Sequence, residues 1–475
     1  MSRLRSSLNL KVIFALSLLI LGAAWLTVAA SPPSDDGTIE QQAKVRTSRD
    51  VFELPPRTSC TVVPAKELFI THVSVVDDCY RTTWSGTCPP HPAPATPGAW
   101  TLGGLLPGIF GTTDPAILSN LTLEWLREWD SVQTINGDVV RDRPLINDLI
   151  IVPWLRASGP QLDQLDMHKA PFRLLAIVSR LDLRKNAAHG GVTSAGEARF
   201  IFNVLDEEGD TTQFNVILEY GLDAADCSDV LDWANAWHSL GSLPFGKNYN
   251  AALQSVTDRF TAIGASPGKT NSSAINQVRS NEIELNLRAG LGEDSIWELR
   301  EFQLPNTSAS PVGLVQSTVE LTPDKQRNKT AQLANFANTK AAAILNNSHS
   351  MPLSWQGQPF RGGAAQHRLN LGWDGPDHCV TIPNPDVRHL LSLNTCSGCH
   401  GLEETGTTFK HVEPRQSGSP SVLSSFLTGG MVPDRCPTGE TRRFGDINRR
   451  RVDLCQLLDK TCTEIDAEPA ISFVH

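Results

Sequence analysis

The chain has 475 residues, with 41 Lys and Arg against 51 Asp and Glu, which gives a formal net charge of -10 at pH 7. This acidic balance argues against nucleic acid as a partner and is ordinary for a soluble exported protein. The length exceeds that of one domain of usual size, so we expect two or three domains.

Residues 1–30 have the pattern of an export signal. Basic residues precede an apolar run from Val12 to Val28, and Val28-Ala29-Ala30 offers small residues for cleavage. The run is long enough for an uncleaved anchor, because about 20 apolar residues span a bilayer. We expect cleavage, which leaves no stable membrane insertion and places the protein in a bacterial periplasm or outside the cell. Residues 31–54 are expected to be a flexible leader.

Residues 55–375 are predicted to form an α+β domain around an antiparallel sheet. Alternating apolar and polar residues indicate two hairpins, one from strands 198–205 and 213–220 and one from strands 281–288 and 296–304. Other strands are expected at 66–76, 172–183 and 313–321. Helices are expected at 114–129, 228–241, 248–263 and 328–345. Grouped rather than strictly alternating strands and helices favour the α+β class.

No motif in this domain names a catalytic residue. The sequence has no GxSxG, HExxH, GxxxxGK[ST] or GxGxxG pattern. Several polar residues stand out and could surround a substrate pocket: Arg180, Asp182, Arg184, His189, Glu197, Arg199, His238, Glu298 and Arg300. Charges on the outer faces of strands are more often solvated or paired across the sheet, and we expect that here. Whether the chain is an enzyme stays open.

Cys396, Cys399 and His400 form a CxxCH pattern, which is typical of covalent haem attachment. Two thiols three positions apart lie about one helical turn from each other, so they can bond the two vinyl groups of one porphyrin while His400 binds the iron. A CxxC dithiol and a zinc site are the alternatives. Asn384 and Pro385 predict the start of a short helix that leads into the motif.

This stretch resembles the mono-haem cytochrome c family, over residues 376–475 only. The resemblance implies a small all-α haem domain with one covalent haem c, electron transfer and a redox partner protein. It also implies His400 as the proximal iron ligand, with a proline carbonyl, here that of Pro414, accepting a hydrogen bond from the ligand.

The ligand on the other face of the haem has two candidates, of which we favour Met431 and keep His411 as the alternative. Met431 matches the family order, in a loop after a middle helix at 419–427 and before a last helix that begins at Asp446. His411 would give a bis-histidine haem of lower potential. An open sixth position is a third possibility, in which the iron can bind peroxide or oxygen.

Other residues around the motif add two expectations. Arginines near the last helix could pair with haem propionates or dock an acidic partner, although a solvated helix face explains them equally well: Arg442, Arg443, Arg449, Arg450 and Arg451. Eight further cysteines suit an oxidising compartment, four in the first half and four around the motif, so we expect disulfides within each half: Cys60, Cys79, Cys88 and Cys227, then Cys379, Cys436, Cys455 and Cys462.

Three hypotheses follow. The first is an exported c-type haem protein that transfers single electrons, with a large N-terminal domain that binds a partner or substrate. The second is a haem enzyme, a peroxidase or oxygenase, whose substrate pocket lies in the N-terminal domain. The third is a disulfide-stabilised envelope binding protein without haem. The oligomeric state cannot be inferred from the sequence.

Overall fold

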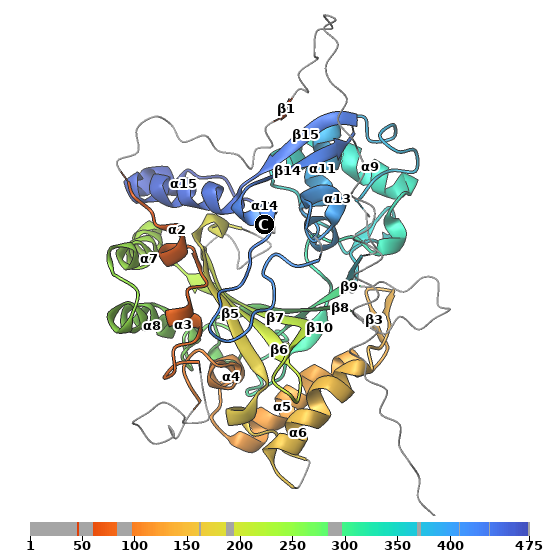
Figure 1. Cartoon of the computed structure of the whole chain (residues 1–475). Helices are drawn as coiled ribbons and strands as arrows, with labels where there is room; N and C mark the ends of the chain where they lie inside the picture. Colours follow the sequence, from red (N-terminus) through yellow and green to blue (C-terminus); the bar gives the residue numbers. More distant parts are fainter. Residues whose placement is uncertain are drawn as a thin grey trace, which may run out of the picture. The chain divides into compact units, whose positions relative to one another are not determined.

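An eight-stranded antiparallel sheet runs through the middle of the protein (Figure 1). Its strands follow the order β10-β9-β8-β7-β6-β5-β2, and β13 pairs with β9 beside β10. The strands are β2 (Phe69–Ile70), β5 (Phe172–Arg180), β6 (Ser194–Leu205), β7 (Thr211–Asp223), β8 (Ile275–Ile283), β9 (Trp297–Gln303), β10 (Val315–Ser317) and β13 (Ala365–His367). Helices accompany this sheet, which confirms the predicted α+β class.

The structure is a computed structural model that describes residues 45–46, 60–82, 97–160, 163–186, 194–283, 297–367, 372–407, 409–436 and 438–473. The expected export signal and most of the expected leader lie outside these residues. Contacts between Cα atoms group Ala43–His475 into one compact unit. No helix among the described residues is both long and apolar enough to cross a membrane.

Both predicted hairpins are present. In the first, β6 pairs with β7, and Phe200 lies opposite Leu218. In the second, β8 pairs with β9, and Asn281 lies opposite Leu299. In the second hairpin β8 begins at Ile275, before the predicted start at residue 281. Residues 284–296, which include the rest of the predicted strand, lie outside the described part of the chain.

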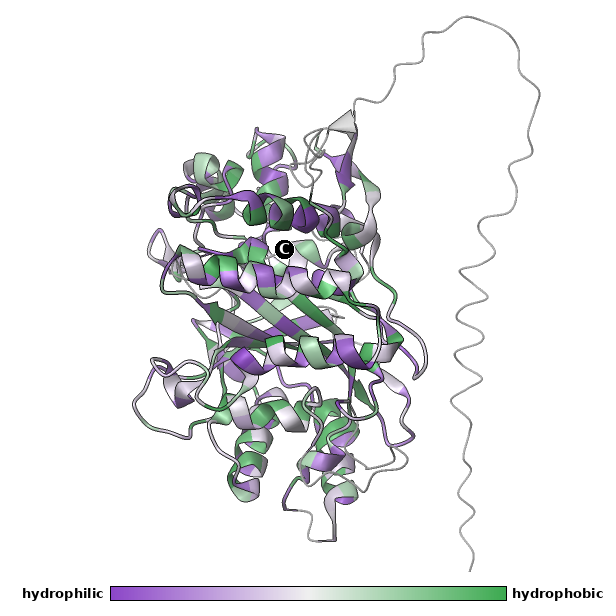
Figure 2. Cartoon of the chain, turned by 90° about the vertical axis from the view of Figure 1, so that its left-hand side faces the viewer, coloured by the Kyte–Doolittle hydropathy of each residue, from purple (hydrophilic) through white to green (hydrophobic). Residues whose placement is uncertain are grey.

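Helices cover one face of the sheet. Phe200, Phe202, Leu218 and Val278 belong to the core formed with these helices. The helices are α4 (Leu102–Phe110), α5 (Pro115–Arg127), α7 (Cys227–Ser239) and α8 (Lys247–Thr261). Figure 2 shows hydrophobic and hydrophilic positions alternating along the helices on this side, as expected of amphipathic surface helices.

Smaller elements complete the part before the CxxCH motif. The predicted strand at 66–76 is instead two short helices, α2 (Pro64–Glu67) and α3 (Val73–Val76), around β2. The predicted helix at 328–345 is divided into α9 (Ala331–Thr339) and α10 (Ala341–Leu345). The rest are β1 (Val45–Arg46), β3 (Gln133–Ile135), β4 (Asp138–Val140), α6 (Val152–Ser158), β11 (Ser354–Trp355) and β12 (Gln358–Pro359).

The C-terminal segment covers the other face of the sheet (Figure 1). Leu393, Val412 and Phe426 pack against Val178 and Ile201 of the sheet. Its elements are α11 (Pro385–Leu393), α12 (Cys396–Cys399), α13 (Leu402–Thr405), α14 (Ser425–Thr428), β14 (Gly430–Arg435), β15 (Thr438–Phe444), α15 (Asp446–Asp459) and α16 (Cys462–Asp466). The segment therefore contains a β-hairpin, β14–β15, where an all-α domain was expected.

Three disulfides lie among the described residues, which is typical of an oxidising compartment outside the cytoplasm. Cys379–Cys436 lies within the C-terminal segment, as expected. Cys60–Cys455 and Cys227–Cys462 instead join the first half to the last two helices, so the expectation of disulfides within each half is wrong for these two. The physical reason is that α15 and α16 pack against α7 and the helical layer.

A buried ionic triad joins the two helices on either side of the CxxCH motif. Glu404 on α13 accepts a hydrogen bond from Nη1 of Arg388 at 2.7 Å, and its other oxygen lies 2.8 Å from Nδ1 of His389, both on α11. All three side chains are 2 % exposed. Burial alone would raise the pKa of Glu404, but Arg388 and His389 lower it to about 2.

We predict that Glu404→Gln lowers the free energy of unfolding at pH 7 by about 3 kcal/mol, because it removes the closer carboxylate of the buried Arg388 guanidinium and leaves only Asp434, at 3.5 Å. The pKa of Glu404 is lower in the folded than in the unfolded state. Its stabilisation is therefore complete above pH 4.5 and is lost as the pH falls towards 2.

Urea denaturation of the wild type and the variant at pH 7 and at pH 3 measures this difference. Glu403→Gln is the matched control, because the partner of Glu403, Arg435, is 50 % exposed, and about 1 kcal/mol or less is expected. An equal loss for both variants, or a loss for Glu404→Gln that is the same at both pH values, would contradict the prediction.

Candidate functional site

A cavity lies between the sheet and the C-terminal segment that covers it. About 840 Å³ of empty space separates its lining atoms, and part of this space opens to solvent. Apolar side chains come from both sides: Phe69, Val178, Ile201, Ile217 and Leu299 from the sheet, and Val412, Phe426 and Leu427 from the C-terminal segment. An apolar lining with a few polar groups is typical of small-molecule and cofactor sites.

The two cysteines of the CxxCH motif line this cavity. Helix α12 delivers them, and the side chain of Thr395 caps this helix by accepting a hydrogen bond from the Gly398 N–H at 2.9 Å. Cys396 and Cys399 are 4 % and 5 % exposed, and their thiols are not joined in a disulfide. Burial raises the pKa of the Cys396 thiol.

His400 also lines the cavity, and its tautomer can be assigned. Nδ1 lies 2.6 Å from the carbonyl oxygen of Phe409. A carbonyl oxygen can only accept, so Nδ1 carries the proton and Nε2 carries the lone pair that a metal would bind. The ring stacks on Trp297, with centroids 4.9 Å apart. Phe409 thus supplies the carbonyl contact that the resemblance led us to expect from Pro414.

Of the two predicted distal ligands, His411 lies beside the motif. Its ring centroid is 4.6 Å from that of His400, and its Nε2 lies 3.3 Å from Sγ of Cys399. Its Nδ1 lies 2.9 Å from the hydroxyl of Ser424. His411 and the CxxCH residues therefore meet at one wall of the cavity.

Met431 lies elsewhere. It belongs to strand β14, it is 63 % exposed, and it borders a separate surface depression with Arg443 and Asn448. The Gly429-Gly430 pair suggested a loop, but the backbone continues as a strand in which exposed Met431 alternates with buried Val432. The structure does not bring Met431 to His400.

The wall opposite the motif is polar and charged. Arg199 forms ion pairs with Glu197 at 2.8 Å and Glu219 at 3.3 Å, and Arg279 pairs with Glu219 at 3.1 Å and Glu301 at 2.9 Å. These residues are buried or nearly so, since the C-terminal segment covers this face. Of the two expected possibilities, solvated or paired across the sheet, these charges are paired, and the face that carries them is covered.

A second buried cluster lies beside the cavity. The guanidinium groups of Arg180, Arg449 and Arg450 share the carboxylates of Asp182 and Asp446. Arg450 lines the cavity, and within the described part of the chain its Nε and Nη1 have no hydrogen-bond partner. Burial, then repulsion by Arg180, lowers the pKa of Arg450 to about 10.

Lys410 is another buried cation at the cavity. Its side chain is 3 % exposed, and among the described residues Nζ has one hydrogen-bond partner, Oδ1 of Asn215 at 3.4 Å. Burial lowers the pKa of Lys410 to about 7. Arg450 and Lys410 thus make the cavity suitable for a ligand that carries negative charge.

Arg180 also lines this cavity, whereas Arg184, His238, Glu298 and Arg300 do not. Arg184 is bound by Asp453 and Glu468, and Arg300 pairs with Glu298 at 2.7 Å. His238 lies 2.7 Å from the buried Glu67 on the helical side. His189 lies outside the described residues. Of the arginines near the last helix, Arg442, Arg449 and Arg450 are buried and paired, whereas Arg443 is exposed.

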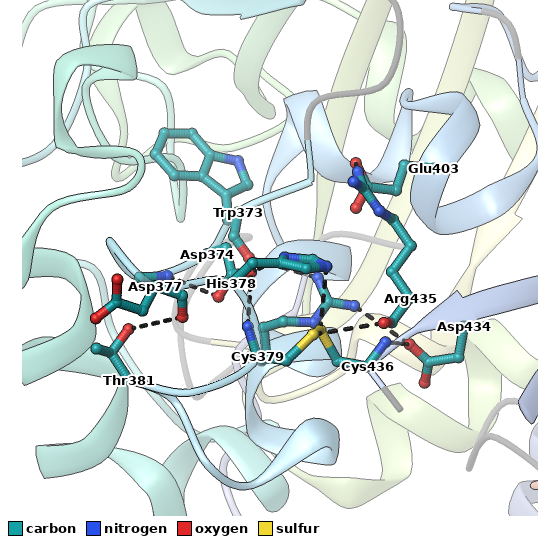
Figure 3. Close-up of a disulfide and its surroundings, with 12 residues drawn as sticks. Trp373, Asp374, Asp377, His378, Cys379, Thr381, Glu403, Asp434, Arg435 and Cys436 are labelled. Carbon is teal, nitrogen blue, oxygen red and sulfur yellow. Dashed lines mark hydrogen bonds and ion pairs between the residues drawn. A yellow bond between two sulfur atoms is a disulfide. The ribbon is translucent and has the colours of Figure 1, made fainter. Parts of the chain in front are cut away.

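The predicted zinc alternative lacks a ready ligand set at the motif. Among the described residues, one group of Cys, His, Asp or Glu has at least three ligand atoms within 4.8 Å of one another, and it is Asp374, His378, Cys379 and Cys436 (Figure 3). Two of these four residues are joined to each other as a disulfide.

Several cavity residues were missed from the sequence, namely Lys410, Arg279 and the carbonyl of Phe409. Arg279 lies on the same face of β8 as Gln277 and Asn281. A polar face of this kind has the same sequence pattern in a strand whose polar face meets water. Phe409 and Lys410 come directly before His411 in the sequence. Their position next to a predicted iron ligand is the signal that could have identified them.

The chain was compared with known proteins in three ways, and none gave a relative. No family model, no curated protein and no solved structure matches it. Any assignment of function therefore depends on the residues of the cavity.

Proposed function

We propose that this protein is an exported c-type haem protein that transfers single electrons. One haem c is bonded to Cys396 and Cys399, with His400 as the proximal iron ligand. The observation that carries the proposal is the shared position of these three side chains on the wall of one cavity. A redox partner protein exchanges electrons with it, and the acidic net charge of the chain favours a partner with a basic surface.

The chemistry of the lining fits a porphyrin. Two thiols not joined in a disulfide suit two vinyl groups, and Nε2 of His400 carries the lone pair that iron requires. The apolar side chains suit the ring. The two propionates of a haem match Lys410, for which no ion pair is recorded among the described residues, and Arg450, which is paired with Asp446 through Nη2 but whose Nε and Nη1 have no hydrogen-bond partner among the described residues.

Each of these residues has a role that the fold supports. When bound, the haem supplies a one-electron iron couple. The Phe409 carbonyl and the Trp297 ring hold the His400 imidazole in one orientation, and the hydrogen bond to Phe409 makes Nε2 a stronger donor to a metal. The apolar walls exclude water, which also influences the potential.

The proposed compartment is a bacterial periplasm or the cell exterior, reached through the export signal at residues 1–30. The disulfides support an oxidising compartment, and haem c is attached after export. Of the distal candidates we favour His411 over Met431, because His411 lines the cavity and Met431 does not. The His400 and His411 ring centroids lie 4.6 Å apart, so His411 would have to move away from His400 to bind the opposite face of the haem.

A haem enzyme is the second candidate, and the polar wall favours it. Arg199, Glu219, Arg279 and Asn281 face the cavity from the sheet, opposite the motif. Such groups could bind and orient a small polar substrate, or hold and move its protons, if the sixth position of the iron were open. This candidate differs from the first in requiring that neither His411 nor Met431 binds the iron.

We predict that the mature protein, produced with haem c maturation, shows a reversible one-electron iron couple and a low-spin ferric spectrum. His411→Ala should convert the spectrum to high spin, while Met431→Ala should leave it unchanged. The absorption spectra of both variants and a potentiometric titration measure this. A titration without a reversible couple would contradict the electron-transfer proposal. A high-spin wild-type protein that binds peroxide would favour the haem-enzyme candidate.

We further predict that Arg450→Met lowers the midpoint potential of the iron. A buried positive charge near the haem favours the reduced form, which carries one positive charge less. The neighbouring Arg451 is the matched control, because it is bound to Asn448 at the surface and does not line the cavity. Equal potentials for the wild type and Arg450→Met, or equal shifts in both variants, would contradict a role of Arg450 at the haem.

A further inference from the structure

A histidine and a carboxylate lie beside the disulfide Cys379–Cys436, away from the cavity (Figure 3). The disulfide joins the loop before α11 to the end of β14. Nε2 of His378 lies 3.7 Å from Sγ of Cys436, and Nδ1 of His378 lies 2.5 Å from Oδ2 of Asp374. The two nitrogens of one imidazole thus face a carboxylate and a sulfur atom.

Asp374 holds His378 in this orientation. It is 4 % exposed and accepts hydrogen bonds from the N–H groups of Gly375 at 2.7 Å and Cys379 at 3.3 Å. An ionised carboxylate can only accept, so Nδ1 of His378 donates to it and Nε2 is directed at Cys436. A base held by a third group and aimed at a sulfur atom is the arrangement that activates thiols in enzymes.

The surroundings favour exchange with a partner from solution. The His378 side chain is 50 % exposed, Cys379 is half-buried, and Arg435, whose side chain is also 50 % exposed, has its carbonyl oxygen 3.4 Å from Sγ of Cys379. Cys379 has a φ of +62°, in the left-handed region that non-glycine residues seldom adopt. Exposure to solvent is typical of reactive rather than structural cysteines.

The other described disulfides lack this arrangement. Among the described histidines, none lies within hydrogen-bond distance of a sulfur atom of Cys60–Cys455 or Cys227–Cys462. These two disulfides also join distant parts of the chain, as structural disulfides do. The features at Cys379–Cys436 are therefore specific to one of the three.

We propose that Cys379–Cys436 is a thiol–disulfide exchange site, with His378 as the proton donor and acceptor for Cys436 and Asp374 as its positioning residue. The partner is a reduced dithiol, on a protein or a small molecule. The site is separate from the proposed haem, but the two are neighbours in the fold. Trp373, which precedes Asp374, donates a hydrogen bond from its indole to the hydroxyl of Ser397 in the CxxCH motif at 3.0 Å.

The exchange proceeds in two displacements. A thiolate of the partner attacks Sγ of Cys379, the more accessible sulfur, and the S–S bond breaks. Nε2 of His378 takes the proton that the attacking thiol of the partner loses, and gives it to Cys436 as this sulfur leaves. The second thiolate of the partner attacks the mixed disulfide and releases Cys379, which is protonated by water. The partner becomes a disulfide, and this chain gains two electrons and two protons.

The test is selective reduction of the full mature protein by dithiothreitol at pH 7, followed by alkylation of the released thiols and mass mapping of the peptides. We expect Cys379–Cys436 to be reduced at least about tenfold faster than Cys227–Cys462. His378→Ala should slow its reduction by about tenfold or more, and added imidazole should restore the rate. Asp374→Asn should slow it too, with partial rescue by imidazole.

His238→Ala is the matched control, because His238 also pairs with a carboxylate, Glu67, but lies on the helical side of the sheet and is not within hydrogen-bond distance of a described cysteine sulfur. It should leave the rate unchanged. Equal rates for the two disulfides, or a His378→Ala variant that reacts like the wild type or does not respond to imidazole, would overturn the proposal. Isolation of the protein with thiols at both positions around a zinc ion would overturn it as well.

Discussion

The structure depends on one constraint, a β-sheet that is buried on both faces. Helices α4, α5, α7 and α8 cover its apolar face. Its other face carries arginine and glutamate side chains, and burying these requires that each charge is paired or meets a ligand. Arg199, Glu219 and Arg279 satisfy each other across three strands, while Arg450 and Lys410 leave positive charge inside the cavity.

The same constraint explains why the CxxCH motif is not carried by an independent small domain. The segment that holds the motif supplies one wall of the cavity, and the sheet supplies the other. Two disulfides, Cys60–Cys455 and Cys227–Cys462, fix the end of that segment to the first half of the chain. The large domain without catalytic motifs therefore contributes directly to the site, through the charged face of its sheet.

Local signals predicted much of this fold. Alternation predicted the β6–β7 hairpin, and Asp114 and Asn384 cap α5 and α11 as their positions suggested. The motif residues were also predictable, since they are adjacent in sequence. The sequence did not predict that the C-terminal segment covers the polar face of the sheet. A strand with one polar face has the same pattern whether that face meets water or a distant segment. Arg450 and Arg279 line one cavity although they are far apart in sequence. A local sequence pattern cannot predict that two such distant residues lie together.

The central claim is that the cavity at Cys396, Cys399 and His400 holds a covalent haem. The most direct measurement is the intact mass of the full mature chain, produced with haem c maturation, followed by mass analysis of the peptide that contains both cysteines. One haem bonded to that peptide, and none after replacement of both cysteines by Ala, is the predicted result. A colourless protein with both thiols unmodified would contradict the claim and leave a disulfide-stabilised binding protein.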